Sequence, residues 1–460
     1  MKIKKTVSVI VATAVMLSVV FTLSGCGEKT PSTVLGAKGE KLAEITSSVS
    51  GKSTYTNEKY SAYIDFVIED AAMALATVKD ISKEDAAELL LSEGYTVSTL
   101  FENETMQALI KSREESALSE DALFGGAALN LSGGVTAVYS SGEYSGISNF
   151  ALAKSQPYSA LKPLSVYAPA LEAGIINWAT PTLDAPFKKI EDESGNLTDW
   201  PTNASGKYTN KNISIGDAVR DSVNTVSVHT LDKLGAKKSL DFLNKSFGLR
   251  LDAEREKIKG SNEEEIYGNL AMGYLIEGIS PVDMAGYYSI FANGGKYTKP
   301  YTVTKITDKN GKEIYKAEPK VKQVISEQTA YIMNRMLNTV VTRGGTGKNA
   351  RVSGVDICGK TGTGSTNALK GNWFSGFTPQ YSMAVWHGGI EGSNIAADLF
   401  KIFAENMDNT KTLHFKAVKG VKKQAFCTQS GGLYAAGCGS ISEGYFSAEK
   451  LPEKCEGHFR

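Results

Sequence analysis

The sequence predicts an α+β fold in which an antiparallel β-sheet is flanked by helices, with a small α+β unit before it. Apolar residues recur at helical spacing over residues 57–119 and in several stretches between residues 159 and 341. β-rich runs separated by Gly, Thr and Pro then crowd residues 352–389. Glycine is abundant, at 45 of 460 residues, and proline is scarce, at 12, which favours tight turns between strands. Helices followed by neighbouring strands are typical of an antiparallel sheet packed against helices.

The first residues predict export from the cytoplasm. Residues 1–5 are cationic, residues 7–23 are apolar, and Leu23-Ser24-Gly25-Cys26 follows. This last sequence resembles the lipobox of bacterial lipoproteins, in which the cysteine becomes the lipidated first residue. We therefore expect a lipoprotein signal peptide over residues 1–25 and a lipid anchor on Cys26, which places the protein outside the cytoplasm on the membrane. The alternative, a permanent transmembrane helix, needs about 20 apolar residues.

The chain from residue 26 to residue 408 divides into three predicted regions, the last of which is the main domain. Residues 26–56 are mostly Ser, Thr, Lys and Gly and predict a flexible tether. Residues 57–124 predict an α+β linker unit with helices, a strand at residues 95–100 and a helix at residues 104–116. The largest unit, residues 125–408, opens with two strands joined at Gly133-Gly134. Its predicted helices are residues 159–174, 215–234, 240–247, 281–292 and 327–341, and its predicted C-terminal strands lie within residues 352–360, 371–379 and 381–389.

Composition excludes one class of partner. The chain has 50 basic and 50 acidic residues, so its net charge is zero, whereas a nucleic-acid binder normally carries a basic surplus. We therefore expect no nucleic-acid partner.

The cysteines after Cys26 do not predict a metal centre. They form no Cys-x-x-Cys pair and have no clustered His ligands, so we expect no metal. Cys358, in an apolar run, is expected to be a buried free thiol. Cys427, Cys438 and Cys455 lie in the tail, residues 409–460, where any two of them would form a stabilising bridge in an oxidising compartment. The sequence leaves the pair open.

Three short motifs carry candidate chemistry. Ser159 and Lys162 lie three residues apart at the start of a predicted helix, which places hydroxyl and amine on one face. Serine is a weak nucleophile without an adjacent base, and burial lowers the pKa of a lysine enough for it to serve. The second motif is Ser222-Val223-Asn224, and the third is Lys360-Thr361-Gly362-Thr363 after an apolar strand. Lysine and hydroxyl groups on such a strand can bind a substrate carboxylate, while glycine permits close approach.

In this order, the three motifs match the set described for penicillin-binding proteins and serine β-lactamases. The chain resembles the transpeptidase domain of class A penicillin-binding proteins over residues 95–459, including the segments at residues 156–174, 278–306 and 358–388 and the cysteine-containing tail. Two features depart from that family. Tyr158 stands where a glycine is usual, and Ala160-Leu161 replaces the common Ser-Phe. The family's glycosyltransferase domain does not fit between Cys26 and the linker unit, so we expect a separate glycosyltransferase as partner.

The resemblance implies a role for each motif residue. Ser159 would attack the D-Ala-D-Ala carbonyl of a peptidoglycan stem peptide and form an acyl-enzyme, and Lys162 would be the base. Ser222 would relay a proton to the leaving amine, and Asn224 would bind Lys162 and the substrate amide. Lys360, Thr361, Gly362 and Thr363 would form the carboxylate-binding strand, and the backbone N–H groups of Ser159 and Thr363 the oxyanion hole.

The resemblance also implies inhibition by β-lactams, which acylate the nucleophile, and no cofactor. The four histidines, His229, His387, His414 and His458, have no catalytic grouping, and His387 is expected at the rim of the site. Three alternatives stay open. A D-alanyl-D-alanine carboxypeptidase differs only in using water as acceptor, and a β-lactamase needs a Glu in a Glu-x-x-Leu-Asn motif, where this chain has Asn334. A non-catalytic β-lactam sensor or cell-wall scaffold would lack a motif residue, and none is lacking here.

Overall fold

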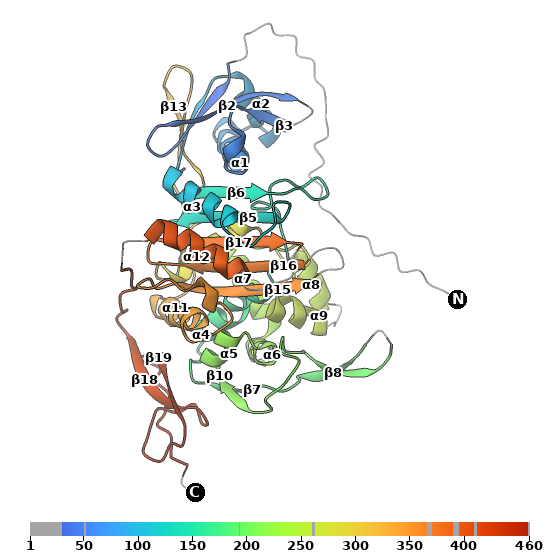
Figure 1. Ribbon diagram of the computed structural model, residues 1–460, viewed down its shortest axis with the longest axis vertical. Coiled ribbons are helices and arrows are strands. Elements are labelled where there is room, and N and C mark those ends of the chain that lie inside the picture. Colours follow the sequence, from blue (N-terminus) through green and yellow to red (C-terminus); the bar gives the residue numbers. More distant parts are fainter. Residues whose placement is uncertain are drawn as a thin grey trace, which may run out of the picture.

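The computed structural model describes residues 30–49, 52–192, 194–259, 263–365, 370–389, 395–408 and 412–458. Within them, an N-terminal sheet lies at one end of the molecule, a second sheet with its helices forms the centre, and a C-terminal hairpin lies at the other end (Figure 1). The predicted α+β class, with an antiparallel sheet flanked by helices, is confirmed. The expected signal peptide, residues 1–25, and Cys26 lie outside the described residues.

The central sheet is antiparallel, with strand order β15-β16-β17-β5-β6. α12 packs on one face, where Phe400 contacts Phe374 of β16 at 5.0 Å between ring centroids. α10 covers β17 from the other face, since the Ser382 hydroxyl donates to the carbonyl of Ala285. β15 is therefore an edge strand, and its free edge is available to other elements. The bounds are β5 (Leu123–Asn130), β6 (Val135–Ser141), β15 (Cys358–Ser365), β16 (Lys370–Phe377), β17 (Tyr381–Gly388), α10 (Pro281–Tyr288) and α12 (Ile395–Asp408).

The predicted tether is wrong for its described part. β1 (Ser32–Leu35), β2 (Lys41–Val49) and β3 (Lys52–Tyr55) form one side of a sheet with order β13-β12-β4-β1-β2-β3. Val34, Leu42 and Ile45 are buried there. Thr and Val favour strands, and one apolar residue at alternate positions is enough for a strand with one buried face. The polar composition of this segment therefore concealed ordered strands.

The N-terminal sheet also contains strands from much later in the chain. β12 (Val303–Thr307) pairs with β4 (Thr96–Thr99), and β13 (Glu313–Lys316) pairs with β12. Asp70 on α1 (Ser61–Lys79) accepts hydrogen bonds from the backbone N–H groups of Thr302 and Val303, at 2.7 and 3.0 Å. The predicted linker unit, residues 57–124, is thus completed by residues predicted to belong to the main domain.

The predicted domain boundary at residue 124 assigns one helix to the wrong unit. α3 (Asn103–Glu114) packs on the central sheet, because a Cβ built on Gly126 of β5 would lie 2.9 Å from Leu109. Lys111 donates to Asn406 of α12 at 3.2 Å, and Arg113 donates to Ser141 of β6 at 3.0 Å. α3 therefore belongs to the helical layer of the main domain, whereas α2 (Lys83–Ser92) packs on the N-terminal sheet.

The helices that carry the first two motifs are interrupted. Residues 159–174, predicted as one helix, consist of the 3₁₀ helix η2 (Tyr158–Leu161), the π-helical η3 (Pro163–Tyr167) and α4 (Ala168–Glu172). Residues 215–234 divide into α5 (Ile215–Asp221) and α6 (Asn224–Leu234), because Ser222 adopts a left-handed conformation with φ of 60°. The other helices are η1 (Glu58–Tyr60), α7 (Ala236–Phe247), α8 (Asp252–Lys259), α9 (Glu263–Tyr267), η4 (Gly268–Met272), η5 (Ser289–Phe291), α11 (Glu327–Thr342) and η6 (Lys348–Ala350).

The remaining strands form small two-stranded units. The pair β18 (Val421–Cys427) and β19 (Ile441–Ser447) makes the C-terminal hairpin, where Tyr445 contacts Trp178 of the main domain at 5.7 Å. The other pairs are β7 (Pro181–Leu183) with β10 (Asn212–Ser214), β8 (Lys188–Glu191) with β9 (Leu197–Trp200), and β11 (Lys296–Tyr297) with β14 (Lys322–Gln323).

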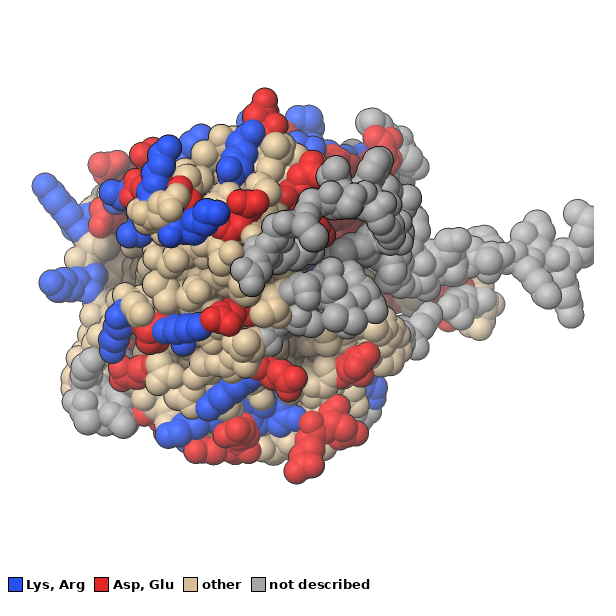
Figure 2. All heavy atoms as spheres, turned by 90° about the horizontal axis from the view of Figure 1, so that it is seen from above, with Lys and Arg blue, Asp and Glu red and all other residues tan. Residues whose placement is uncertain are grey.

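Charges of both signs are mixed on the surface of the N-terminal end. Figure 2 shows Lys and Arg interspersed with Asp and Glu on this face. This agrees with equal numbers of basic and acidic residues in the chain. The visible face therefore offers no extended basic area of the kind that a polyanion requires.

Candidate active site

Ser159 lies in the 3₁₀ helix η2, and Lys162 is the residue that caps its C-terminal end. In 3₁₀ geometry residues three apart are aligned, so the two side chains project in the same direction. Ser159 is partly exposed, whereas Lys162 is completely buried. The first motif thus presents an accessible hydroxyl above a buried amine.

The second motif contacts this amine. Lys162 Nζ donates to the backbone carbonyl of Ser222 at 3.0 Å and to Asn224 Oδ1 at 2.6 Å. The left-handed turn at Ser222 directs that carbonyl towards Lys162, and Asn224 is the first residue of α6. The Asn224 amide nitrogen donates to the carbonyl of Thr202 at 2.7 Å, which fixes its oxygen towards the lysine.

The third motif approaches from the edge strand β15. Lys360 Nζ donates to the Ser222 hydroxyl at 2.9 Å and to the carbonyl of Thr361 at 3.1 Å. Thr363, farther along the strand, is exposed. The two lysines of the first and third motifs therefore converge on one serine of the second.

Burial changes the protonation of both lysines. Burial, assisted by the positive charge of Lys360, holds the pKa of Lys162 well below its usual range. Burial lowers the pKa of Lys360 to about 7. At neutral pH the site can therefore contain one neutral and one charged amine.

Gly362 permits the third motif to reach the first. A Cβ at this position would lie 2.3 Å from the carbonyl oxygen of Pro157 and 3.2 Å from the backbone nitrogen of Ala160. The sequence led us to expect that this glycine gives room to the substrate. In the structure it gives room to the helix that carries Ser159.

The comparisons with known proteins agree with this geometry. Residues 130–402 match the family described as the penicillin binding protein transpeptidase domain. The chain belongs to this family. It is 31% identical over 340 residues to penicillin-binding protein 1F of Bacillus subtilis, which covers 72% of this chain and 43% of the relative. It is 34% identical over 251 residues to penicillin-binding protein 1A of Clostridium acetobutylicum, which covers 53% of this chain and 29% of the relative. The chain thus spans less than half the length of these curated relatives.

Solved structures show the same fold. Penicillin-binding protein 1A from Haemophilus influenzae superposes with a TM-score of 0.67 at 17% identity, covering 89% of this chain and 78% of that one. The D,D-transpeptidase domain of a peptidoglycan glycosyltransferase from Eggerthella lenta gives a TM-score of 0.61 at 18% identity, covering 83% of this chain and 98% of that one. The fold predicted from the three motifs is therefore that of a penicillin-binding transpeptidase domain.

Tyr158, the residue before Ser159, has a backbone conformation that favours glycine. Its φ is 49°, in the left-handed region that most side chains avoid. The ring fits because glycines lie beneath it: a Cβ on Gly364 would be 2.2 Å from the ring, and one on Gly371 would be 3.3 Å away. Tyr158, Gly371 and Trp386 help to line a pocket of about 250 Å³. The tyrosine ring therefore forms part of the wall of this pocket, next to Ser159 in the chain.

A network that the sequence did not reveal holds the second motif. Asn203 Oδ1 accepts the backbone N–H groups of Asn224 and Thr225, at 3.0 and 3.3 Å, and so caps α6 from a distant loop. Asp184 in turn accepts from the Asn203 amide and the Thr225 hydroxyl, both at 2.7 Å. Burial acts to raise the pKa of Asp184, but hydrogen bonds from Thr225, Thr209 and Asn203 together lower it. These residues lie in loops without periodic patterns, so no sequence signal indicated them.

Thr346 is a second residue that the motifs did not indicate. Its hydroxyl accepts a hydrogen bond from the Thr361 hydroxyl at 2.8 Å. Its backbone N–H donates to the carbonyl of Arg220 on α5. Thr346 therefore connects the third motif to the helix that precedes the second. The neighbouring glycines, Gly344, Gly345 and Gly347, were the sequence feature that could have drawn attention to it.

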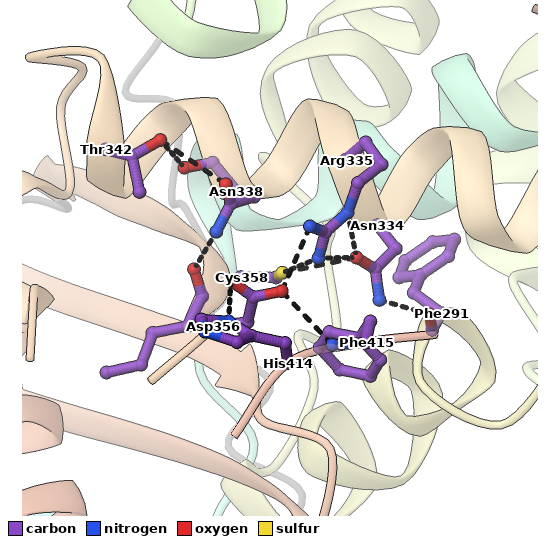
Figure 3. Close-up of polar contacts among 10 residues, drawn as sticks. Phe291, Asn334, Arg335, Asn338, Thr342, Asp356, Cys358, His414 and Phe415 are labelled. Carbon is purple, nitrogen blue, oxygen red and sulfur yellow. Dashed lines mark hydrogen bonds and ion pairs between the residues drawn. The ribbon is translucent and has the colours of Figure 1, made fainter. Parts of the chain in front are cut away.

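The segment that most resembles a β-lactamase motif supports β15 from behind (Figure 3). Asn334, buried on α11, donates to the carbonyl of Phe291 at 3.0 Å and accepts from Arg335 and from Cys358. Arg335 also pairs with Asp356 at 3.0 Å. Burial raises the pKa of Cys358 to about 12, so this cysteine is the inert buried thiol expected from the sequence. These contacts anchor the start of the strand that carries Lys360.

One histidine prediction is wrong. His387 on β17 is fully buried rather than at the rim, and burial, with a contribution from Arg113, lowers its pKa to about 4. It is therefore a neutral core residue. Side chains along β17 alternate between the two faces of the sheet. Because helices cover both faces, this alternation does not distinguish a core position from one at the rim.

The cysteines of the tail and the lengths of the described helices give two further outcomes. Cys427, Cys438 and Cys455 are free thiols, so the bridge considered from the sequence is not present. Among the described helices, none is both long and apolar enough to cross a membrane.

Proposed function

We propose that this protein is a penicillin-binding D,D-transpeptidase that cross-links peptidoglycan stem peptides through an acyl-enzyme on Ser159. The observation that carries the proposal is the convergence of Lys162 and Lys360 on Ser222 beside an accessible serine. Membership in the transpeptidase family supports the same activity.

Lys162 is suited to act as the general base. A neutral amine has two N–H donors and one lone pair. The donors are used by the carbonyl of Ser222 and by Asn224 Oδ1, so the lone pair is left for the Ser159 proton. Its lowered pKa keeps it neutral when substrate arrives.

The acylation step follows from these positions. Ser159 Oγ attacks the carbonyl carbon of the penultimate D-alanine and transfers its proton to Lys162. The backbone N–H groups of Ser159 and Thr363 stabilise the oxyanion, where one such donor typically contributes ~2.7–4 kcal/mol. The C–N bond then breaks, and the proton passes from Lys162 through Ser222 to the amine of the departing D-alanine.

The third motif binds the substrate's terminal carboxylate. Charged Lys360 and the exposed hydroxyl of Thr363 provide donors for the carboxylate, and Thr361, whose hydroxyl donates to Thr346, would contribute once that hydroxyl turned to the substrate. The free edge of β15 allows an extended peptide to pair with it as an added strand. β-Lactams carry the same carboxylate and would acylate Ser159.

The acyl group is then transferred to an amine of a second stem peptide. Transfer to water instead would make the protein a carboxypeptidase on the same site. A β-lactamase is less well supported, because the position of its expected Glu is Asn334, whose amide is held by Phe291 and Arg335.

We further propose that a lipid on Cys26 holds the enzyme at the outer face of the membrane, where a separate glycosyltransferase supplies glycan strands. The lipobox-like sequence Leu23 to Cys26 supports the anchor. Firm attachment needs two membrane-binding signals rather than one chain.

Labelling with fluorescent penicillin tests the function. Ser159→Ala should abolish labelling and leave the thermal transition almost unchanged, while the control Ser132→Ala, in an exposed turn, should label normally. Persistent labelling of Ser159→Ala would remove this serine from its role. Incubation with a stem-peptide donor and an amino acceptor then distinguishes cross-linked from trimmed product.

A further inference from the structure

The C-terminal tail folds back so that residues from three separate turns meet. After the hairpin β18–β19, the last described segment returns beside residue 433. There the Leu433 N–H donates to Glu453 and the Cys455 N–H donates to Leu433, both at 2.8 Å. These bonds bring the end of β18, which is Cys427, close to Cys455.

Two thiols and an imidazole meet at this point. The Nε2 atom of His458 is 3.1 Å from the sulfur of Cys427 and 3.5 Å from the sulfur of Cys455. All three of these atoms lie within 4.8 Å of one another. Both cysteines are buried, whereas the histidine is exposed. The expectation that the tail cysteines have no His nearby is therefore wrong, because the fold brings His458 to them.

Cys438 lies beside this group, in the turn that directly follows Gly437. The backbone N–H of His458 donates to the carbonyl of Gly437 at 3.1 Å, which holds the turn containing Cys438 against the histidine. The turn that carries a fourth residue of a type that binds soft divalent metals thus lies beside the three grouped side chains.

Their separations fit a tetrahedral metal site. Zinc bonds of ≈ 2.3 Å to sulfur and ≈ 2.0–2.1 Å to nitrogen place neighbouring ligand atoms about 3.5–3.8 Å apart. Of the two sulfur–nitrogen distances, that from His458 to Cys455 (3.5 Å) lies in this range and that to Cys427 (3.1 Å) is slightly shorter. The Gly457 N–H also donates to the sulfur of Cys455 at 3.4 Å, a contact that stabilises a thiolate ligand.

We propose that Cys427, Cys438, Cys455 and His458 bind one Zn²⁺ as a structural Cys₃His site. On binding, the three thiols release their protons to solvent and the neutral imidazole donates its Nε2 lone pair, with no change in oxidation state. Four protein ligands leave no open position, so the metal has no catalytic role.

A metal explains the arrangement better than a disulfide. A disulfide bond between two of the cysteines would not involve the third thiol or the histidine, although both lie at the same place. The tail also has a small apolar core, centred on Phe426 and Phe446, and small units of this kind usually need a covalent or metal link. The site would fix β19, whose Tyr445 packs on Trp178 of the main domain.

The first test measures metal in the full-length protein, purified in detergent with Zn²⁺ present and then freed of unbound metal. Elemental analysis should give about one zinc per chain. Cys438→Ser and His458→Ala should each lose most of it, while the matched controls Cys358→Ser and His414→Ala should retain it. Zinc-free wild-type protein, or retention of zinc in both ligand variants, would overturn the site.

The second test distinguishes a metal from a disulfide and does not depend on activity. A chelator should release the zinc, expose about three additional reactive thiols and lower the thermal transition of wild-type protein but not of Cys438→Ser. A mass about 2 Da low, with Cys427 and Cys455 linked in a peptide map, would instead establish a bridge and refute the proposal. Penicillin labelling of His458→Ala should persist. Loss of zinc therefore tests the metal site alone, and loss of labelling tests the proposed function alone.

Discussion

Lys360 donates a hydrogen bond to the hydroxyl of Ser222 at 2.9 Å, and both residues are held there by separate elements, an edge strand and a left-handed turn between two helices. The carbonyl of the same serine accepts from Lys162 at 3.0 Å. Through this serine the two buried amines lie close enough for the charge on Lys360 to lower the pKa of Lys162. The protonation states of the two lysines are thus coupled.

Acylation should depend on pH through both lysines. Lys360 is charged below its pKa of about 7 and loses its charge above it, so kcat/KM for a carboxylate-bearing β-lactam should fall as pH rises through this value. At low pH the rate should fall again as Lys162 becomes protonated. Lys360→Arg, which stays charged, should move only the alkaline limb to higher pH. Stopped-flow acylation from pH 5 to 10 measures this, and an alkaline limb that does not move in the variant would contradict it.

Asn203 should act as a positioning residue for the second motif. Asn203→Ala removes the cap of α6 and should lower the free energy of unfolding by about 1 kcal/mol. It should also slow penicillin acylation, because Asn224 no longer holds Lys162. The control is Asn196→Ala, in the β8–β9 turn, which should change neither quantity. If acylation slows but the acidic limb of its pH–rate profile, which reports protonation of Lys162, does not shift, Asn203 acts only on stability.

Gly362→Ala should damage the site although no functional group is removed. The added methyl would lie 2.3 Å from the Pro157 carbonyl, so β15 and η2 must separate. Overpacking of this kind costs typically 1–3 kcal/mol, and a displacement near 1 Å can cost ~10²-fold in rate. Acylation kinetics and thermal unfolding measure both effects. Gly439→Ala, where a Cβ meets open space, is the control, and equal behaviour of the two variants would refute the close-approach argument.

Release of the penicilloyl group should be slow. Asn334 is buried on α11, its amide donates to Phe291 and accepts from Arg335, and an amide is not basic, so it provides no base for water at the acyl-enzyme. A chromogenic β-lactam should give a burst of about one equivalent and then almost no turnover. Sustained hydrolysis by the purified protein would favour a β-lactamase.

Cys26 should carry the membrane anchor. Cys26→Ser should abolish the lipid adduct on the mature N-terminus and move the protein from the membrane to the soluble fraction. Intact-protein mass spectrometry and fractionation measure the two effects. The same lipid mass on the Ser variant would exclude this cysteine as the attachment site.

The sequence was sufficient for the parts of the molecule that depend on local pattern. The three motifs and the strands of the central sheet follow from spacing and periodicity, as does the helical structure around Ser159 and Asn224, although its interruptions do not. Asp184, Asn203 and His458 did not, because their roles arise from contacts between loops far apart in the chain. The strands of residues 30–55 were missed because Ser and Thr there suggested a tether, although alternate burial of single apolar residues is enough for a strand.

The shared N-terminal sheet also governs the order in which this chain can fold. β4 remains an open edge until β12 is available, and β12 follows the entire segment that carries Ser159 and Ser222. A protein that crosses a membrane N-terminus first would therefore present an unpaired, aggregation-prone edge during translocation. For the same reason, a fragment that begins after residue 124 would leave β12 and β13 without their partner strand, so the two units cannot be separated by a single cut.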